Sequence, residues 1–174
     1  MEPAVQVAIL TASDRAAAGI YEDQSGPALE KLVRRSLDAE VVATEILPDN
    51  QIQIAAQLRK WADEGTLDLI LITGGTGFAP TDVTPEATRE VIEKETPGLA
   101  EVMRAASLRV TPHAMLSRAV CGIRGHTLIV NLPGSPKGAT ENLRAILPAL
   151  PHAIGLLRGK PESEAGHALH THSI

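Results

Sequence analysis

Short apolar runs alternate with helical segments along this chain, and this alternation restricts its fold more than any other feature. The run Asp68–Thr73 (DLILIT) is apolar on both faces, as a central strand of a parallel sheet is. Val5–Leu10 and Glu40–Leu47 are earlier runs rich in β-branched residues, and each predicts a buried strand. Because parallel strands need crossover connections, the alternation predicts an α/β fold with helices on both faces of a mostly parallel sheet.

The segments between these runs carry helical spacing and helix-start signals. Ala28–Leu37 has apolar residues three and four positions apart, and Ser25 is its expected N-cap, with Pro27 in the first turn. Ile52–Ala62 shows the same spacing after a turn, and another helix is expected to begin near Thr84. These segments supply the crossover helices that the fold requires.

The C-terminal half is predicted to add a hairpin and further helices. Arg118–Ile123 and Thr127–Leu132 are strand-like runs joined by a short turn. Ala139–Leu157 is mostly helical, with interruptions at Pro148 and Pro151. The expected fold is therefore a three-layer α/β/α sandwich whose mostly parallel sheet receives a C-terminal β-hairpin.

Length and composition indicate one soluble domain. The chain has 174 residues, of which 44% are hydrophobic and 21% charged, as in a typical globular protein. We expect residues 1–158 to form a single domain and residues 159–174 to form a flexible polar tail. His167, His170 and His172 lie close together in that tail, where a solvated segment is favoured over a metal site.

Charge and cysteine content narrow the range of functions. A net charge of −5 argues against a general nucleic-acid or membrane binder. No apolar run reaches membrane-spanning length, and Met-Glu-Pro-Ala before the first run is not the basic region of a signal peptide. The single cysteine, Cys121, excludes an internal disulfide and suits a reducing compartment, so a cytoplasmic location is expected.

A glycine-rich turn, Thr73-Gly-Gly-Thr-Gly77, directly follows the third strand-like run. In an open α/β sheet, ligands bind beyond the carboxyl ends of the strands. Glycine lets bare backbone N–H groups approach an anion, so Gly74, Gly75, Thr76 and Gly77 are candidates for a phosphate-binding turn. The alternative is an ordinary strand-to-helix turn that needs positive φ. The turn matches neither a Walker A loop nor the G-x-G-x-x-G fingerprint.

Asp82 follows this turn, five residues after Gly77. A carboxylate beside phosphates is repulsive unless a cation lies between them. Mg²⁺ is commonly held by one or two carboxylates together with phosphate oxygens, so Asp82 is a candidate magnesium ligand. The alternative interpretation is that Asp82 caps the helix that begins near Thr84.

Polar residues at other strand ends are expected to share this rim. Ser13 and Asp14 follow the first strand, and Asp49 follows the second. Taken alone, Asp49 would more often cap a helix, but three carboxylates beside a glycine turn favour a ligand site. The turn NLPGSP after the last strand is a second rigid turn, in which Asn131 and Ser135 are candidates to hold a ring or a phosphate.

The sequence shows no nucleophile–base pair. Cys121 lies among apolar residues and is interpreted as packing. His113 and His126 fall in turns, and His152 falls in an apolar helical stretch, where packing explains it. The absence of a paired nucleophile argues against acyl transfer. It is compatible with phosphoryl or nucleotidyl transfer, in which positioning and charge neutralisation dominate.

Seven motifs occur in one order along the chain and together resemble a known family. They are Thr11-Ala-Ser-Asp-Arg15, Asp23-Gln-Ser-Gly-Pro27, Thr73-Gly-Gly-Thr-Gly77, Asp82-Val-Thr-Pro-Glu-Ala-Thr88, Pro97-Gly-Leu99, Met115-Leu-Ser-Arg118 and Asn131-Leu-Pro-Gly-Ser-Pro136. The set is similar to the MogA/MoaB family of molybdenum-cofactor biosynthesis proteins, which also provides the G domain of gephyrin-like proteins. The resemblance covers about residues 5–158. The forms of the fourth and seventh motifs resemble the MogA branch more than the MoaB branch.

The resemblance implies a three-layer α/β fold, a homotrimer and a partner that inserts molybdate downstream. It also implies a molybdopterin adenylyltransferase that uses ATP and Mg²⁺ and releases pyrophosphate. Asp49 and Asp82 match the family's essential carboxylates, which are expected to be catalytic and to hold the metal. The glycine turn matches the family's phosphate-binding turn. The positions that match its pterin–nucleotide pocket are Ser13, Asp14, Ser107, Asn131, Pro133, Gly134 and Ser135.

Two other functions stay open at this point. One is a molybdopterin-binding or scaffold protein of the same fold that lacks transfer activity, and the intact pair Asp49 and Asp82 speaks against it. The other is an assembly protein whose oligomer matters more than its pocket. The clustering of polar residues at strand ends speaks against that second alternative.

Overall fold

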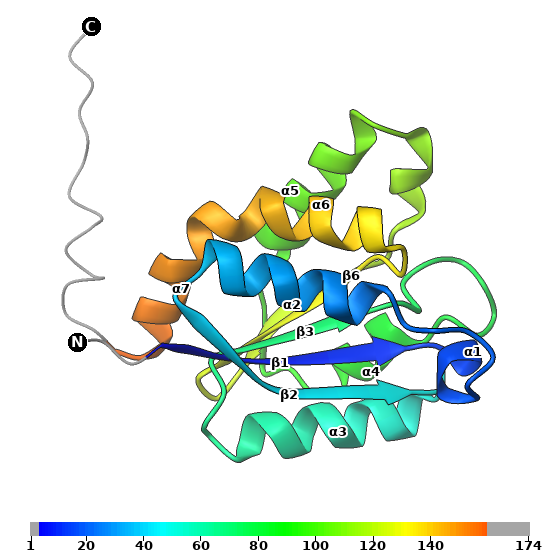
Figure 1. Ribbon diagram of the computed structural model, residues 1–174. Coiled ribbons are helices and arrows are strands. Elements are labelled where there is room, and N and C mark those ends of the chain that lie inside the picture. Colours follow the sequence, from blue (N-terminus) through cyan, green and yellow to red (C-terminus); the bar gives the residue numbers. More distant parts are fainter. Residues whose placement is uncertain (1–3, 160–174) are drawn as a thin grey trace, which may run out of the picture.

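Six strands form one mixed sheet in the order β2-β1-β3-β6-β5-β4 in the computed structural model, which describes residues 4–159 (Figure 1). β1 is parallel to β2 and β3, β3 is parallel to β6, and β5 is antiparallel to β6 and β4. The predicted mostly parallel sheet with a C-terminal hairpin is therefore confirmed. The strands are β1 (Val5–Ala12), β2 (Ala39–Leu47), β3 (Leu69–Thr73), β4 (Lys94–Glu95), β5 (Cys121–Arg124) and β6 (Thr127–Leu132).

Helices cover both faces of this sheet and make the three expected layers. α2, α5, α6 and α7 pack on one face, whereas α3 and α4 pack on the other (Figure 1). The α-helices are α1 (Asp14–Ala17), α2 (Ser25–Ser36), α3 (Gln51–Asp63), α4 (Thr84–Arg89), α5 (Pro97–Leu108), α6 (Pro136–Ile146) and α7 (Leu150–Leu157), and two 3-10 helices are η1 (Pro112–Leu116) and η2 (Leu147–Ala149).

The central strand β3 shows why this sequence needs two covering layers. All five of its residues are buried. Leu69 and Leu71 face the core under α2 and α6, whereas Ile70 and Ile72 face the core over α3. Since successive side chains of a strand point to opposite faces, an unbroken apolar run can be buried only between two layers of helices.

The register of the parallel strands brings four chain segments to one edge of the sheet. Thr11 of β1 lies beside Thr73 of β3, and Thr73 lies beside Leu132 of β6. Ala12 pairs with Leu47, the last residue of β2. The loops that follow these four strands therefore meet at the same edge, where ligands bind in open α/β sheets.

The beginning of α2 differs from the prediction. Ser25 is the first helical residue and not the N-cap, and its hydroxyl donates to the Gly134 carbonyl at 2.6 Å. The Asp23 carboxylate accepts from the N–H groups of Ser25 and Gly26 at 3.0 and 3.2 Å. A carboxylate two residues earlier thus takes over the capping role, and frees the serine hydroxyl for a tertiary contact.

Two other local features, the strand β4 and the proline interruptions near the C-terminus, can be compared with the sequence prediction. The two-residue strand β4 was not predicted, because so short a run carries no periodicity and is defined by its pairing with β5. The interruption at Pro148 is confirmed, since α6 ends at Ile146 and α7 begins at Leu150, whereas the predicted interruption at Pro151 is wrong because this proline lies in the first turn of α7.

The ends of the chain leave one prediction untested. Residues 160–174, including the three histidines of the expected tail, lie outside the described residues. The division into a domain of residues 1–158 and a tail therefore stays a prediction. Within residues 4–159, no helix has both the length and the apolar character needed to cross a membrane.

Candidate active site

The glycine turn is wedged between the ends of β1 and β6. Gly74 and Gly75 both have positive φ, at 97° and 64°. The N–H of Gly74 donates to the Leu132 carbonyl at 3.1 Å. A methyl group on Gly74 would lie 2.2 Å from the Ala12 carbonyl oxygen. Glycine is required here both for its backbone conformation and for the close approach of neighbouring strands.

Gly75 lies against two polar atoms that have no partner. A methyl group on Gly75 would lie 2.6 Å from Oγ1 of Thr84 and 3.0 Å from Oδ1 of Asp49. Both oxygens are buried without a hydrogen bond. Buried polar atoms are nearly always satisfied in folded proteins, so an unsatisfied pair beside a bare backbone indicates a place where a ligand completes the bonding.

Asp49 is fixed by a reciprocal contact with Asp14. The N–H of Asp14 donates to Asp49 Oδ2 at 3.0 Å, and the N–H of Asp49 donates to Asp14 Oδ1 at 2.9 Å. Burial raises the pKa of the Asp49 carboxyl above its ordinary value, the N–H of Asp14 opposes that rise, and the charges of Asp14 and Asp82 add to it. Helix α3 is capped instead by Asn50, which accepts from the N–H of Gln53. Asp49 is therefore free of the capping role.

Asp82 does not cap the following helix either. Its carboxylate accepts from the N–H of Ala79 at 3.1 Å, and α4 begins at Thr84 without a side-chain cap. The capping interpretation of Asp82 is therefore wrong. A methyl group on Gly77 would lie 2.9 Å from Asp82 Oδ2, which places the carboxylate against the glycine turn as expected.

Two cavities meet at this turn. The larger has a volume of about 480 Å³ and lies between the glycine turn, the end of α5 and the start of α6. The smaller, of about 190 Å³, lies between the glycine turn and the segments that follow β1 and β2. Three residues line both cavities, namely Gly75, Asp82 and Gly134. A ligand in one cavity can therefore meet a ligand in the other beside Asp82.

Most of the predicted site residues border these cavities. The larger one is lined by Thr76, Gly77, Ser107, Pro133 and Ser135. The smaller one is lined by Ser13, Asp49 and Gly74. Asp14 borders neither cavity, and reaches the site through its contact with Asp49.

Asn131, like Asp14, borders neither cavity. It is fully buried, its amide donates to Thr88 Oγ1 at 2.8 Å, and its carbonyl oxygen accepts from the N–H of Val120 at 3.1 Å. Both ends of its side chain are thus used within the domain. Its position at the end of β6 ties α4 and β5 to the strand that carries the second turn.

The second turn presents the beginning of α6 to the larger cavity. Ser135 caps α6 by accepting from the N–H of Gly138 at 3.0 Å. Pro133 is held through its carbonyl, which accepts from Thr73 Oγ1 at 2.6 Å. Ser107, at the end of α5, accepts from the Asn142 amide at 2.7 Å. These bonds fix the walls of the cavity before any ligand arrives.

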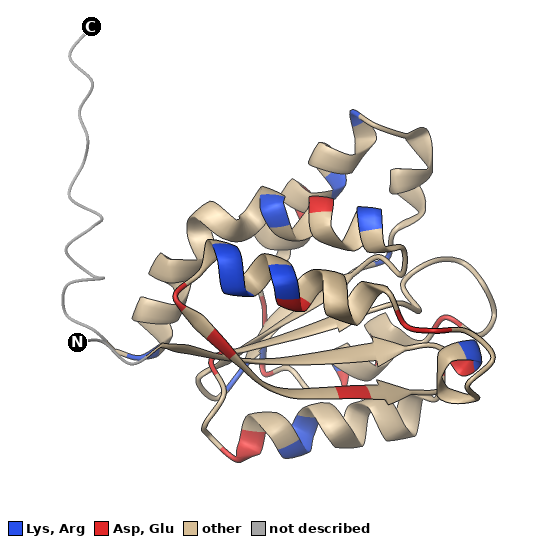
Figure 2. Ribbon diagram, viewed as in Figure 1, with Lys and Arg blue, Asp and Glu red and all other residues tan. Residues whose placement is uncertain are grey.

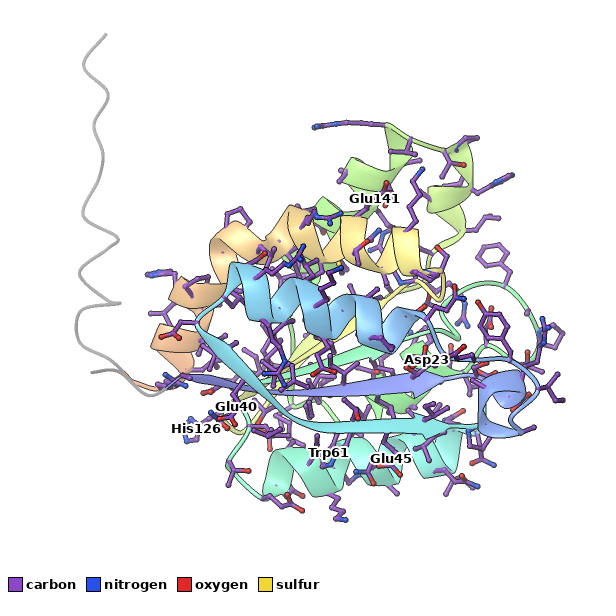
Figure 3. The ribbon with its side chains drawn as sticks, in the orientation of Figure 1. Asp23, Glu40, Glu45, Trp61, His126 and Glu141 are labelled. Atoms are coloured by element: carbon purple, nitrogen blue, oxygen red, sulfur yellow. The ribbon has the colours of Figure 1, made fainter. Side chains whose placement is uncertain are left out.

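Acidic side chains surround the smaller cavity. Asp23, Asp49 and Asp82 line it, and none of the described residues that line it is a lysine or arginine. Figure 2 shows acidic residues between α1 and α2 at this end of the sheet. In Figure 3, Asp23 lies near the end of β1, whereas Glu40 and His126 lie at the opposite end of the molecule. An anionic ligand would need a cation here.

Three residues of this site carry only weak sequence signals, namely Tyr21, Asp23 and Thr84. The pattern at Thr84 predicts only the start of a helix, although its hydroxyl is buried beside Asp49. Asp23 begins the second of the seven motifs, whose sequence predicts no role for this carboxylate, and Tyr21 lies in a loop without a pattern. Both line the smaller cavity. The Asp23-Gln-Ser-Gly motif, which follows the first strand, is the signal that could have pointed to this loop.

The residues considered as nucleophiles are not arranged for covalent catalysis. Cys121 is buried, and burial raises the pKa of its thiol to about 12, which confirms its interpretation as packing. His126 Nδ1 lies 2.9 Å from the Leu157 carbonyl oxygen, and His113 lines the larger cavity. His152 is exposed on α7, so its interpretation as a packed residue is wrong.

Comparison with known proteins gives the family. Residues 8–152 match the family described as "Probable molybdopterin binding domain". The chain belongs to this family. A molybdopterin adenylyltransferase from Helicobacter pylori is 44% identical, over 89% of this chain and 89% of that protein. A gephyrin from Dictyostelium discoideum is 44% identical over 90% of this chain, which spans 23% of that longer protein.

Comparison with solved structures finds the same family. The crystal structure of the molybdopterin biosynthesis enzyme MoaB from Thermus thermophilus is 54% identical, with a TM-score of 0.85 over 90% of this chain and 98% of that one. The predicted family and its three-layer fold are therefore confirmed. Because this similar structure is named MoaB, membership of the MogA branch stays a prediction.

Proposed function

We propose that the protein is a molybdopterin adenylyltransferase of molybdenum-cofactor biosynthesis. The observation that carries the proposal is the meeting of two cavities at Gly75 and Asp82, in a chain whose bacterial relatives carry that name over most of their length. Two cavities with a common border suit a reaction that joins two substrates. The reaction transfers AMP from ATP to the terminal phosphate of molybdopterin.

The chemistry needs no nucleophile from the protein. An oxygen of the molybdopterin phosphate attacks the α-phosphorus of ATP, and a new P–O bond forms. The bond between the α-phosphorus and the bridging oxygen to the β-phosphate breaks, and pyrophosphate leaves with that oxygen. The task of the protein is to bring the two phosphates into line and to stabilise the negative charge between them.

The glycine turn and the start of α6 can stabilise this phosphate charge with uncharged backbone N–H groups. At Gly75 the backbone approaches the site without a side chain, which lets N–H groups contact a phosphate directly. The N-terminus of α6, between Ser135 and Gly138, points partial positive charge toward the larger cavity. The glycine turn is held by backbone hydrogen bonds, and the start of α6 by the hydroxyls of Thr73 and Ser135, so little rearrangement is needed on binding.

The residues present fit a magnesium ion. The unsatisfied Oδ1 of Asp49 and the raised pKa of this carboxyl both indicate a site that lacks a positive partner. Among residues 4–159, no group of three or more His, Cys, Asp or Glu forms a protein-only cage. Asp49 and Asp82 would therefore hold Mg²⁺ together with substrate oxygens and water, which is its usual coordination in nucleotide sites. When bound, the ion neutralises phosphate charge.

The quaternary structure and partner are part of the same proposal. The family resemblance supports a homotrimer and a downstream protein that inserts molybdate. Exposed apolar side chains, such as Val42 and Ile46 on the outer strand β2, provide surface for contacts between subunits. Light scattering of the purified protein measures the number of subunits directly, and a monomer would contradict this part.

The test of the proposed function is the substitution Asp82→Asn. Wild-type protein is expected to release pyrophosphate from ATP only when molybdopterin and Mg²⁺ are both present. The variant is expected to lose at least about 99% of this activity, because removing one charged group from a nucleotidyl-transfer site costs on the order of 100-fold or more in rate. Activity at the wild-type level in the variant would contradict the role of the carboxylate.

The second candidate, a molybdopterin-binding protein without transfer activity, is separated by the same measurements. It predicts molybdopterin binding without pyrophosphate release. Thermal unfolding with ATP and Mg²⁺ adds a direct test of nucleotide binding, since a ligand at 100 times its dissociation constant stabilises the fold by about 2.7 kcal/mol. No shift at saturating nucleotide would favour the scaffold.

A further inference from the structure

We propose that Arg118 is a positioning residue that holds the loop between Gly77 and Asp82 in the shape that presents the Asp82 carboxylate to substrate. The inference rests on the proposed function, because it gives Asp82 the role described above. Arg118 ends the motif Met115-Leu-Ser-Arg118, one of the seven that carry the family resemblance. The motif's sequence indicates no role for Arg118, but its contacts in the structure do.

The guanidinium of Arg118 contacts both ends of this loop. Its Nε donates to the Gly77 carbonyl at 2.7 Å, and its Nη2 donates to the Asp82 carbonyl at 2.9 Å. Its own backbone N–H donates to the Thr76 carbonyl at 2.9 Å. A single side chain from the segment before β5 therefore contacts the start and the end of a loop, which lie 41 and 36 residues earlier in the chain.

Arg118 is itself held by an acidic residue of α4. Its Nη1 pairs with Oε1 of Glu86, and its Nη2 lies 3.4 Å from Oε2 of the same carboxylate. The hydrogen bond from Arg118 lowers the pKa of the Glu86 carboxyl, so the pair stays ionised at neutral pH. α4 begins at Thr84, whose N–H donates to the Gly75 carbonyl at 3.1 Å. The loop, α4 and the glycine turn are thus connected through one cation.

The loop has weaker restraints of its own. The N–H of Asp82 donates to the Ala79 carbonyl at 2.9 Å, and the N–H of Ala79 donates to Asp82 Oδ2 at 3.1 Å. The residues at its tip are exposed, with Phe78 exposed by 67%. With these two internal contacts and an exposed tip, the loop has few restraints of its own, so we expect its shape to depend on the arginine.

Arginine suits this task better than lysine. The planar guanidinium has five donors in a fixed fork, so it can reach two carbonyls and a carboxylate at once. A lysine ammonium at the same place keeps the charge but is a point donor on a flexible stem. If the positive charge of Arg118 were sufficient, the variant Arg118→Lys would behave like the wild type. If the forked guanidinium positions the loop, the lysine variant should behave like Arg118→Met.

The experiment compares Arg118→Met and Arg118→Lys with the control Arg124→Met. Arg124 likewise donates to a backbone carbonyl, that of Val91, and pairs with Asp63, but it lies at the end of β5 away from the two cavities. Two readouts are measured at a temperature where each variant is folded by circular dichroism. They are the Mg²⁺ concentration for half-maximal pyrophosphate release and the hydrogen exchange of the Ala79 and Asp82 amides.

We expect both Arg118 variants to need about tenfold more Mg²⁺ and to exchange the two amides about tenfold faster, since each loses charge-assisted bonds to the loop. The Arg124 variant should match the wild type in both readouts, whatever its melting temperature. An Arg118 variant that melts earlier but keeps wild-type Mg²⁺ dependence and amide exchange would overturn the proposal. Full rescue by lysine would also overturn it, because charge would then suffice.

Failure of the proposed function would look different. If wild-type protein releases no pyrophosphate with molybdopterin, ATP and Mg²⁺, adenylyl transfer is refuted before any variant is made. The exchange of the Ala79 and Asp82 amides does not depend on activity. Unchanged exchange in Arg118→Met would then refute the positioning of the loop on its own evidence.

Discussion

Replacing Gly75 with alanine tests the central geometry of the site. The new methyl group would lie 2.6 Å from Thr84 Oγ1 and 3.0 Å from Asp49 Oδ1, whereas ordinary carbon–oxygen contacts begin near 3.4 Å. The backbone of Gly75 also has a φ of 64°, in the left-handed region that alanine disfavours. The substitution therefore combines backbone strain with a clash against two residues of the site.

The two contributions can be estimated separately. Left-handed backbone costs an L-residue about 1–2 kcal/mol. Forcing an extra methyl group into packed surroundings costs about 1–3 kcal/mol. We therefore expect Gly75→Ala to lower the free energy of unfolding by about 2–5 kcal/mol, and to reduce pyrophosphate release because Asp49 and Thr84 must move.

Gly65→Ala is the matched control. Gly65 follows α3 with a φ of 70°, and a methyl group there would meet no heavy atom within 4 Å. It shares the backbone strain and lacks the clash, so we expect a loss of about 1–2 kcal/mol and full activity. The assay is urea unfolding followed by circular dichroism, alongside pyrophosphate release.

Equal losses of stability in the two alanine variants, with activity kept in Gly75→Ala, would refute this reasoning. That result would mean that the side chains around Gly75 yield without cost. The turn would then need glycine for its backbone conformation alone, and the unsatisfied oxygens of Asp49 and Thr84 would not mark a tightly formed site.

Two further predictions concern titrating groups. Because burial raises the pKa of Asp49, the ionised carboxylate destabilises the fold above that pKa. The variant Asp49→Asn should therefore melt at a higher temperature than wild type at pH 7 while losing activity, and this gain in melting temperature should fade as the pH falls toward the ordinary value of 3.8. A lower melting temperature of the variant at pH 7 would contradict the prediction. The Cys121 thiol, with its pKa raised to about 12, should not react with a thiol reagent in the native protein at pH 8 but should react after unfolding in urea, and rapid native labelling would contradict its burial.

The fold could be predicted from the sequence because the patterns that indicate strands and helices are local and occur repeatedly along the chain. The apolar run that becomes β3 is buried on both sides, as in a central strand of a parallel sheet. The edge strand β4 was missed, because a strand of two residues is defined by its neighbour. The N-cap of α2 was misassigned, since Ser25 is drawn to Gly134 by tertiary structure.

The candidate site was accessible only in part. Gly75 and Asp82 could be named because a glycine turn at a strand end can bind an anion, and a carboxylate follows it by five residues. Asn131 also lies at a strand end, where a side chain is expected to reach a ligand. It is nevertheless buried, and both polar ends of its side chain form hydrogen bonds inside the domain. The direction of a side chain at a strand end depends on the neighbouring strands, which a sequence pattern does not specify.

By itself, the sequence determined the alternation of strands and helices and the glycine turn, because each depends on residues close together in the chain, and it determined the family through the order of seven short motifs. Only the tertiary structure decided that Asp49 and Thr84 lie against Gly75, and that Arg118 holds the loop before Asp82. The physical reason is the order of the sheet. β6 lies beside β3, with the antiparallel β5 and β4 outside it, and this order brings residues 36 positions apart within hydrogen-bonding distance.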